Sequence, residues 1–154
     1  MVNYTAAAEA AARRWCGWVV TPPEENVEVT LDGGGAVLSL PSLYVTELVS
    51  VVEDGTTLDL DDVRLYGSLG QVRKRSGGCW GCEVVVTFTH GFDSAPDFDA
   101  AVEQAATALE AASTRSDSAV KRIKVDDVET EWFESASSFL NVSLLSPYRI
   151  LPQP

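Results

Sequence analysis

The sequence predicts an α+β protein. An N-terminal helix and C-terminal helices form a small helical bundle, with an inserted antiparallel β-hairpin region and an extended C-terminal tail. Two observations carry this prediction. The stretch from 84 to 112 changes from β-branched alternation to an apolar stripe at helical spacing, so a strand leads into a helix. An alanine-rich segment opens the chain, and short apolar runs separated by glycine turns lie between that segment and residue 84.

We expect one domain across residues 1–154, because 154 residues are enough to bury a real core. Its parts are a helix over 3–17, a β insert over 26–90, a helix over 95–113, and an extended arm, short helix and tail over 119–154. The net charge of −12, from 23 acidic and 11 basic residues, argues against direct wrapping of nucleic acid. Every apolar run falls short of the ~18 residues of a membrane span, so we expect no membrane partner.

The first element is an alanine-rich helix over 6–16, which Gly17 ends. Such a helix lets a neighbouring helix come close, either in the same chain or in another copy. Trp15 and Trp18 are expected to be core or interface anchors. Prolines then make 21–23 an extended linker.

Four chain reversals are predicted in the β insert. Residues 27–31 and 36–40 flank Asp32-Gly33-Gly34-Gly35, which is a hairpin signal. The other three reversals are Val45–Val52 turning at Asp54-Gly55 to pair with Thr56–Leu58, Val63–Tyr66 and Leu69–Arg75 around Gly67 and Gly70, and Ser76–Cys82 leading into Val84. Together they predict about six or seven short antiparallel strands.

The last strand is predicted over 84–89, with Val84, Val86 and Phe88 on one face. A helix follows, because Pro96 suits a first helical position. Its expected apolar stripe is Phe98, Ala101, Val102, Ala105, Leu109 and Ala112.

A small-residue, polar stretch predicts a break at 113–118. We then expect an extended arm or weak hairpin over 121–132 and a last short helix over 137–145. Pro147 ends that helix, and the prolines of 148–154 keep the tail extended.

The pair Cys79-x-x-Cys82 is open to three interpretations. It could supply half of a tetrahedral zinc site, with Cys16 and His90 completing the set. It could be a redox pair, although such pairs need the first cysteine at a helix N-terminus. It could also be a turn whose small residues happen to be cysteines. The only histidine, His90, lacks a partner for catalysis and is expected to be a satisfied turn residue, so we expect no enzyme and no cofactor.

Three further motifs have ordinary explanations. Asp59, Asp61 and Asp62 lack the glycine and glutamate of a calcium loop, which predicts a solvated acidic turn. The glycines of 33–35 lack the Lys-Ser/Thr of a phosphate loop. The basic run 73–75 is typical of a guarded edge strand, or it contacts an acidic neighbour.

Taken in order, four segments resemble the head-to-tail adaptor (connector) proteins of long-tailed bacteriophages, particularly the actinobacteriophage type. They are Arg14-Trp15-Cys16-Gly17-Trp18 with Pro22 and Pro23; Thr30–Gly35 with Leu38–Pro41 and Glu53-Asp54-Gly55; Val86–Phe92 followed by Ala95-Pro96 and a helix; and Leu145–Pro152. The resemblance spans nearly the whole chain. The pair Cys79 and Cys82 departs from the family pattern.

The resemblance implies a structural virion protein that is made in the host cytoplasm and located in the neck between capsid and tail. Such adaptors form a homo-oligomeric ring, usually of about twelve copies, beneath the portal protein. They extend the channel through which double-stranded DNA passes without specific binding. They also offer a platform to the next protein, a head-closure or tail-terminator protein.

By the same resemblance, the tail is expected to bind the portal. Its residues are Tyr148, Arg149, Ile150, Leu151 and Pro152. The ring-interface candidates are Arg13, Arg14, Arg73, Lys74 and Arg75. Two alternatives are a small zinc-binding or thiol protein that uses Cys79 and Cys82, and a free-standing β-rich binding module.

Overall fold

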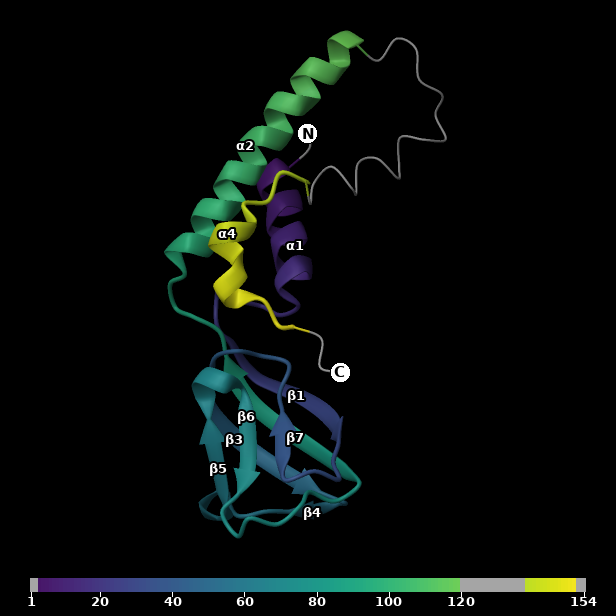
Figure 1. The fold of residues 1–154 in the computed structure, drawn as a ribbon, viewed down its shortest axis with the longest axis vertical. Helices are drawn as coiled ribbons and strands as arrows, with labels where there is room; N and C mark the ends of the chain where they lie inside the picture. Colours follow the sequence, from purple (N-terminus) through teal and green to yellow (C-terminus); the bar gives the residue numbers. More distant parts are fainter. Residues whose placement is uncertain (1–2, 120–137, 152–154) are drawn as a thin grey trace. The chain divides into compact units, whose positions relative to one another are not determined.

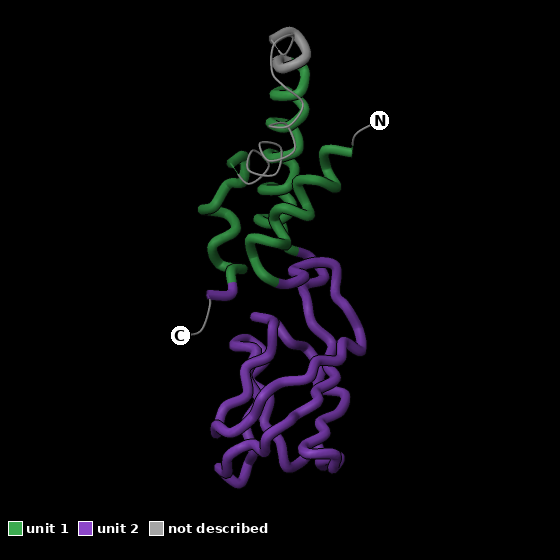
Figure 2. The backbone as a smooth tube through the Cα atoms, turned by 90° about the vertical axis from the view of Figure 1, so that its right-hand side faces the viewer, with its two compact units in different colours: residues 1–17, 95–149 green, residues 18–94, 150–154 purple. Residues whose placement is uncertain are grey.

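The structure is a computed structural model that describes residues 3–119 and 138–151. The chain divides into two compact units (Figure 2). A helical unit takes residues 1–17 and 95–149, and a β unit takes residues 18–94 and 150–154. The domain expected from the sequence is therefore built from two parts, with an α+β composition as predicted. The arm expected over 121–132 lies outside the described residues.

The helical unit begins with α1 (Tyr4–Cys16). Asn3 caps it, because its side-chain oxygen accepts a hydrogen bond from the Ala6 N–H at 3.0 Å. Gly17 ends it in the left-handed region, with φ of 87°, and donates its N–H to the Arg13 carbonyl. Both ends are therefore set by the residue types that the sequence places there.

The partner of α1 is α2 (Pro96–Ala119), and the two helices lie side by side in the helical unit (Figure 1). Ala8, Ala12 and Cys16 are buried on α1. The predicted stripe of α2 is buried at Phe98, Ala101, Val102, Ala105 and Leu109. The alanine face of α1 thus serves packing within the chain, and the Tyr4 hydroxyl adds a hydrogen bond to Ser113 Oγ at 2.8 Å.

The break predicted at 113–118 is wrong, because α2 continues to Ala119. Ser113 and Thr114 donate their hydroxyl groups to the Glu110 carbonyl at 2.8 and 3.0 Å, which satisfies these side chains inside the helix. The last helix is also shorter than predicted. It is α4 (Val142–Leu145), followed by a 3-10 turn η3 (Ser146–Tyr148), so the extended tail begins only at Arg149.

The β unit contains two antiparallel sheets (Figure 1). The first, sheet A, has the strand order β1-β7-β3-β4, and the second, sheet B, has the order β2-β6-β5. The strands are β1 (Glu24–Asp32), β2 (Val37–Ser39), β3 (Val45–Glu53), β4 (Thr56–Thr57), β5 (Val63–Tyr66), β6 (Gln71–Lys74) and β7 (Glu83–His90). Two 3-10 turns, η1 (Leu60–Asp62) and η2 (Gly67–Leu69), flank β5.

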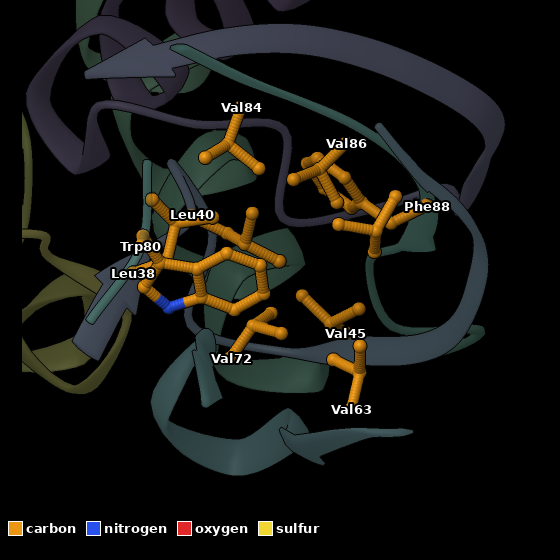
Figure 3. Packing of buried hydrophobic residues seen from close by; sticks show 10 residues of the cluster. Leu38, Leu40, Val45, Val63, Val72, Trp80, Val84, Val86 and Phe88 are labelled. Atoms are coloured by element: carbon orange, nitrogen blue, oxygen red, sulfur yellow. The ribbon is translucent and has the colours of Figure 1, made fainter. Parts of the chain in front are cut away.

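Side chains from both sheets form one apolar core (Figure 3). Strand β7 contributes Val84, Val86 and Phe88, which are fully buried on the face that the alternation predicted. Sheet B contributes Leu38, Val63 and Val72. Trp80 closes the cluster from the segment that precedes β7.

Two predicted hairpins form, and two do not. Strand β3 pairs with β4, and β5 pairs with β6, as predicted. The hairpin across 27–40 is wrong: β1 pairs with β7 in sheet A, whereas β2 pairs with β6 in sheet B. The reversal at 76–82 likewise joins two sheets, because β6 and β7 lie in different ones.

The glycine run explains this error. Gly33 donates its N–H to the Cys82 carbonyl, Gly34 donates to the Trp80 carbonyl, and the Gly35 carbonyl accepts from Trp80 N–H. The run therefore pairs with 80–82 and carries the chain from one sheet to the other. A Cβ at Gly33 would lie 1.7 Å from the Gly81 carbonyl oxygen, so only glycine fits.

Candidate interaction surfaces

The C-terminal segment contacts the helical unit at Tyr148 and Arg149. The Tyr148 ring meets Phe98 of α2 edge-on, with ring centroids 6.4 Å apart. The Arg149 guanidinium lies 4.7 Å from the centre of the Trp15 ring on α1. These two residues, expected to be free anchors for a partner, are thus fastened to their own unit.

Leu151 offers an exposed apolar side chain at the end of the described tail. It is 68% exposed, which is high for a leucine. Ile150 is half-buried, and Pro152 lies outside the described residues. Among the described portal-binding residues, Arg149 and Leu151 are the exposed ones, and Leu151 is the one that presents apolar surface to a partner.

Titratable groups beside this segment respond to burial. Burial raises the pKa of the Cys16 thiol to about 11, and the nearby Arg149 charge lowers it in part. Burial also raises the pKa of Tyr148, with Asp97 and Asp99 adding to the effect. Both groups stay neutral at neutral pH, so neither adds a charge beside the Arg149 guanidinium.

The basic residues at the end of α1 have local roles. Arg13 forms an ion pair with Glu9 one helical turn earlier, at 2.6 Å. Arg14 is exposed in the last turn. Positive charge at a helix C-terminus is stabilising because of the helix dipole. Nothing in these contacts selects either residue for a ring interface, so that role stays a prediction.

Lys74 is engaged within the chain. Its ammonium group lies 2.6 Å from a Glu53 carboxylate oxygen, donates to the Cys79 carbonyl at 2.9 Å and sits over the Trp80 ring. Glu53 also accepts the Gly81 N–H at 2.6 Å. The bond from Lys74, and then that from Gly81, lower the pKa of Glu53. This cluster closes the corner between β3, β6 and the Trp80 segment.

The basic run does not guard an edge strand, as the sequence suggested, because β6 is the central strand of sheet B. Arg73 lies directly opposite Arg64 of β5. The two guanidinium groups lie 5.3 and 5.5 Å from the centre of the Tyr66 ring. Sequence reasoning missed Arg64 and Tyr66, although their i, i+2 spacing on a strand was the available signal.

The cysteine pair lies on the surface of the β unit. Cys79 and Cys82 are exposed free thiols, and Cys16 is buried in the helical unit. Within 3–119 and 138–151, no three His, Cys, Asp or Glu side chains gather where they could hold a metal ion. The Cys82 N–H donates to Asp54, so the segment is held by its backbone. Nothing here favours the zinc interpretation.

His90 is a buried strand residue and is not the satisfied turn residue that we expected. Its ring packs against Phe88 and Trp18, at centroid distances of 5.2 and 5.9 Å. Neither ring nitrogen has a hydrogen-bond partner among the described residues. A Glu24 carboxylate oxygen lies 3.6 Å from Nε2. Burial lowers the pKa of His90 and the Glu24 carboxylate partly opposes this.

A groove of about 690 Å³ runs along the helical unit between α1 and α2. Phe98 and Val102 give it an apolar part, and Glu9, Glu103 and Glu110 line it with carboxylates.

The acidic turn at 59–62 has a structural role. Asp59 caps η1 by accepting a hydrogen bond from the Asp61 N–H, as expected of a solvated acidic turn. No helix in the described part of the chain is both long and apolar enough to cross a bilayer.

Comparison with known proteins places the fold. No protein-family model and no curated protein matches the sequence. A chain in the neck of an empty gene transfer agent (GTA) particle, computed with C6 symmetry, aligns with a TM-score of 0.60 and 18% identity, over 98% of this chain and 78% of its own. A chain in the neck of the native GTA particle, computed with C12 symmetry, gives 0.58 and 16%, over 98% and 82%. The likeness at this identity is one of fold.

Proposed function

We propose that the chain is a head-to-tail adaptor, a structural subunit of a virion neck. The observation that carries the proposal is the shared fold over 98% of the chain with neck chains of GTA particles. Those necks were computed with C6 and C12 symmetry, so their chains repeat around an axis. The four sequence segments that resemble phage adaptors point the same way, independently of the fold.

Ring formation follows from this role. Copies related by rotation meet through heterologous contacts, in which two different surfaces of the chain face each other. The chain's net charge of −12 suits a channel wall, because DNA moves past an acidic surface without sticking to it. The ring sits beneath the portal, and its other face receives the head-closure or tail-terminator protein.

The burial of His90 is also consistent with a structural role. His90, the only one in the chain, lies at the end of β7 with its ring enclosed by Phe88 and Trp18. A general base must reach a proton on its substrate, and His90 is buried, with only 5% of the residue exposed. We therefore assign His90 no catalytic step.

The tail binds the portal through its apolar end in this proposal. Tyr148 and Arg149 fix the point at which the tail leaves the helical unit, through their contacts with Phe98 and Trp15. Leu151, which is largely exposed, then buries its side chain against the portal. The anchor and the binding segment are thus adjacent but separable.

Two truncations test this division. Ending the chain after Arg149 leaves both anchoring contacts in place, and we expect unchanged thermal stability with at least roughly tenfold weaker binding to portal. Ending it after Ser146 also removes Tyr148 and Arg149, so stability falls as well. Replacing 150–154 with a Gly/Ser segment of equal length is the matched control. Full portal affinity in the chain that ends at Arg149 would show that the tail is not the binding segment.

A further inference from the structure

At two places in the β unit, two side chains of like charge lie directly opposite each other on neighbouring strands. In sheet B, Arg64 lies opposite Arg73, and in sheet A, Asp32 lies opposite Glu83. Side chains directly opposite in an antiparallel pair are about 5 Å apart, and like charges there are destabilising. The isolated chain therefore carries two unfavourable pairs of opposite sign.

The two arginines lie with a tyrosine on one exposed face of sheet B. Arg64, Tyr66 and Arg73 share one face of sheet B, opposite to the face that buries Val72. Their contacts with the Tyr66 ring hold both guanidinium groups on that face. No ion pair to either arginine occurs among the described residues. Arginine and tyrosine are the residue types that most often anchor interfaces.

The acidic pair occupies a corner whose geometry is also fixed. Asp54 accepts the N–H groups of Glu83 and Cys82, at 2.9 and 3.3 Å, which holds the end of β7 beside the β3–β4 turn. Asp32, Asp54 and Glu83 are all exposed. Among the described residues, Lys74 forms its ion pair at this corner with Glu53. Lys74 lies on the inner side of β6 and Arg73 lies on the outer side, so Arg73 does not share in that contact.

We propose that the Arg64–Tyr66–Arg73 face of one copy binds the Asp32–Glu83 corner of a second copy. The contact neutralises both like-charge pairs at once, and it joins two different surfaces, as a closed ring requires. The proposed contact depends on the adaptor function only in that the contacting copies close into a ring. Nucleic acid is the less suitable occupant, because residues 18–94 hold four Lys or Arg against twelve Asp or Glu.

Charge reversal tests the contact. R64E/R73E and D32K/E83K should each weaken self-association, alone or on the portal, by about tenfold or more, measured by sedimentation velocity. Combining all four changes in one chain, or mixing the two variants, should restore association. K121E/R122E is the control, since it changes net charge as much as R64E/R73E at positions that belong to neither charged surface, and it should leave association unchanged. Equal loss in K121E/R122E, or no rescue, would overturn the proposal.

Crosslinking detects self-association that is too weak to be measured by sedimentation velocity. In the R64K/R73K variant the new amines keep the charge, and a carbodiimide can join them to carboxylates. Mass spectrometry of the dimer should identify bonds between positions 64 or 73 of one copy and Asp32 or Glu83 of another. Dimers without such bonds would overturn the proposal.

Three further outcomes separate the claims. If the R64E/R73E variant forms the same rings as the wild-type chain, this contact is refuted and the adaptor role is not affected. Crosslinks as described in R64K/R73K, together with a wild-type chain that leaves the portal bare, would support the contact and refute the adaptor role. Binding of duplex DNA that is lost in R64E/R73E, without crosslinked dimers, would assign the face to nucleic acid and also overturn the proposal.

Discussion

Tyr148, Arg149 and Lys74 show how residue type alone misleads about function. Each is a residue type common at interfaces, and each is held by contacts within its own unit. Arg64 and Tyr66 are just as ordinary in the sequence, yet their strand places them beside Arg73 on one face. The contact partners therefore decide which basic residues are available for binding.

His90 makes stability depend on pH. Burial lowers its pKa below the ordinary 6.5, so the unfolded chain takes up a proton before the folded chain does. Stability should therefore fall as pH drops from about 7 to about 5, and H90F should lose less over that range. Urea unfolding at several pH values measures the difference between the two proteins. The same slope in both would contradict a neutral buried His90.

Glu24 provides a matched variant for this experiment. Its carboxylate is the group that faces the His90 ring, 3.6 Å from Nε2, and it opposes the effect of burial. E24Q should therefore lower the pKa of His90 further and steepen the loss of stability below about pH 6.5. The double variant H90F/E24Q should show no such steepening.

At the scale of elements, the glycine run that joins β1 to β2 is the critical connection. G33A should destabilise the β unit by roughly 1–3 kcal/mol, because the new Cβ would overlap the Gly81 carbonyl and separate the run from 80–82. G35A is the control, since its Cβ would meet nothing nearer than 3.7 Å. Thermal unfolding of both variants measures the difference. Equal stability of G33A and wild type would mean that the run does not pair with 80–82 in solution.

Elements with strong local signals could be predicted from the sequence. Alternation gave the buried face of β7, Pro96 marked the start of α2, and Gly17 marked the end of α1. The partner of β1 could not be predicted, because a glycine run suits either a hairpin or a crossing between sheets. The contact with 80–82 decides between them, and it involves residues nearly fifty positions away.

The surfaces were harder to predict than the elements. The sequence predicts a portal-binding tail, which stays a prediction, and the division of that tail at Arg149 depends on contacts with α1 and α2. The sequence singles out Arg73 but not the residue opposite it, Arg64, because the register of β5 and β6 sets that pairing. Register is fixed by the buried face and the turn, which a single strand does not reveal.

At the scale of the whole molecule, two units divide the work. The helical unit anchors the tail, and the β unit carries both the basic face and the acidic corner. In the role proposed above, the apolar end of the tail would contact the portal, and the two charged surfaces would contact the neighbouring copies in a ring.

The most direct test is electron cryomicroscopy of the purified chain mixed with the portal protein of its own genome. The account predicts a closed ring of copies on the portal axis, related by sixfold or twelvefold symmetry, with the residues after Arg149 against the portal. A portal that stays bare at saturating chain, or copies that attach to it without rotational order, would contradict it.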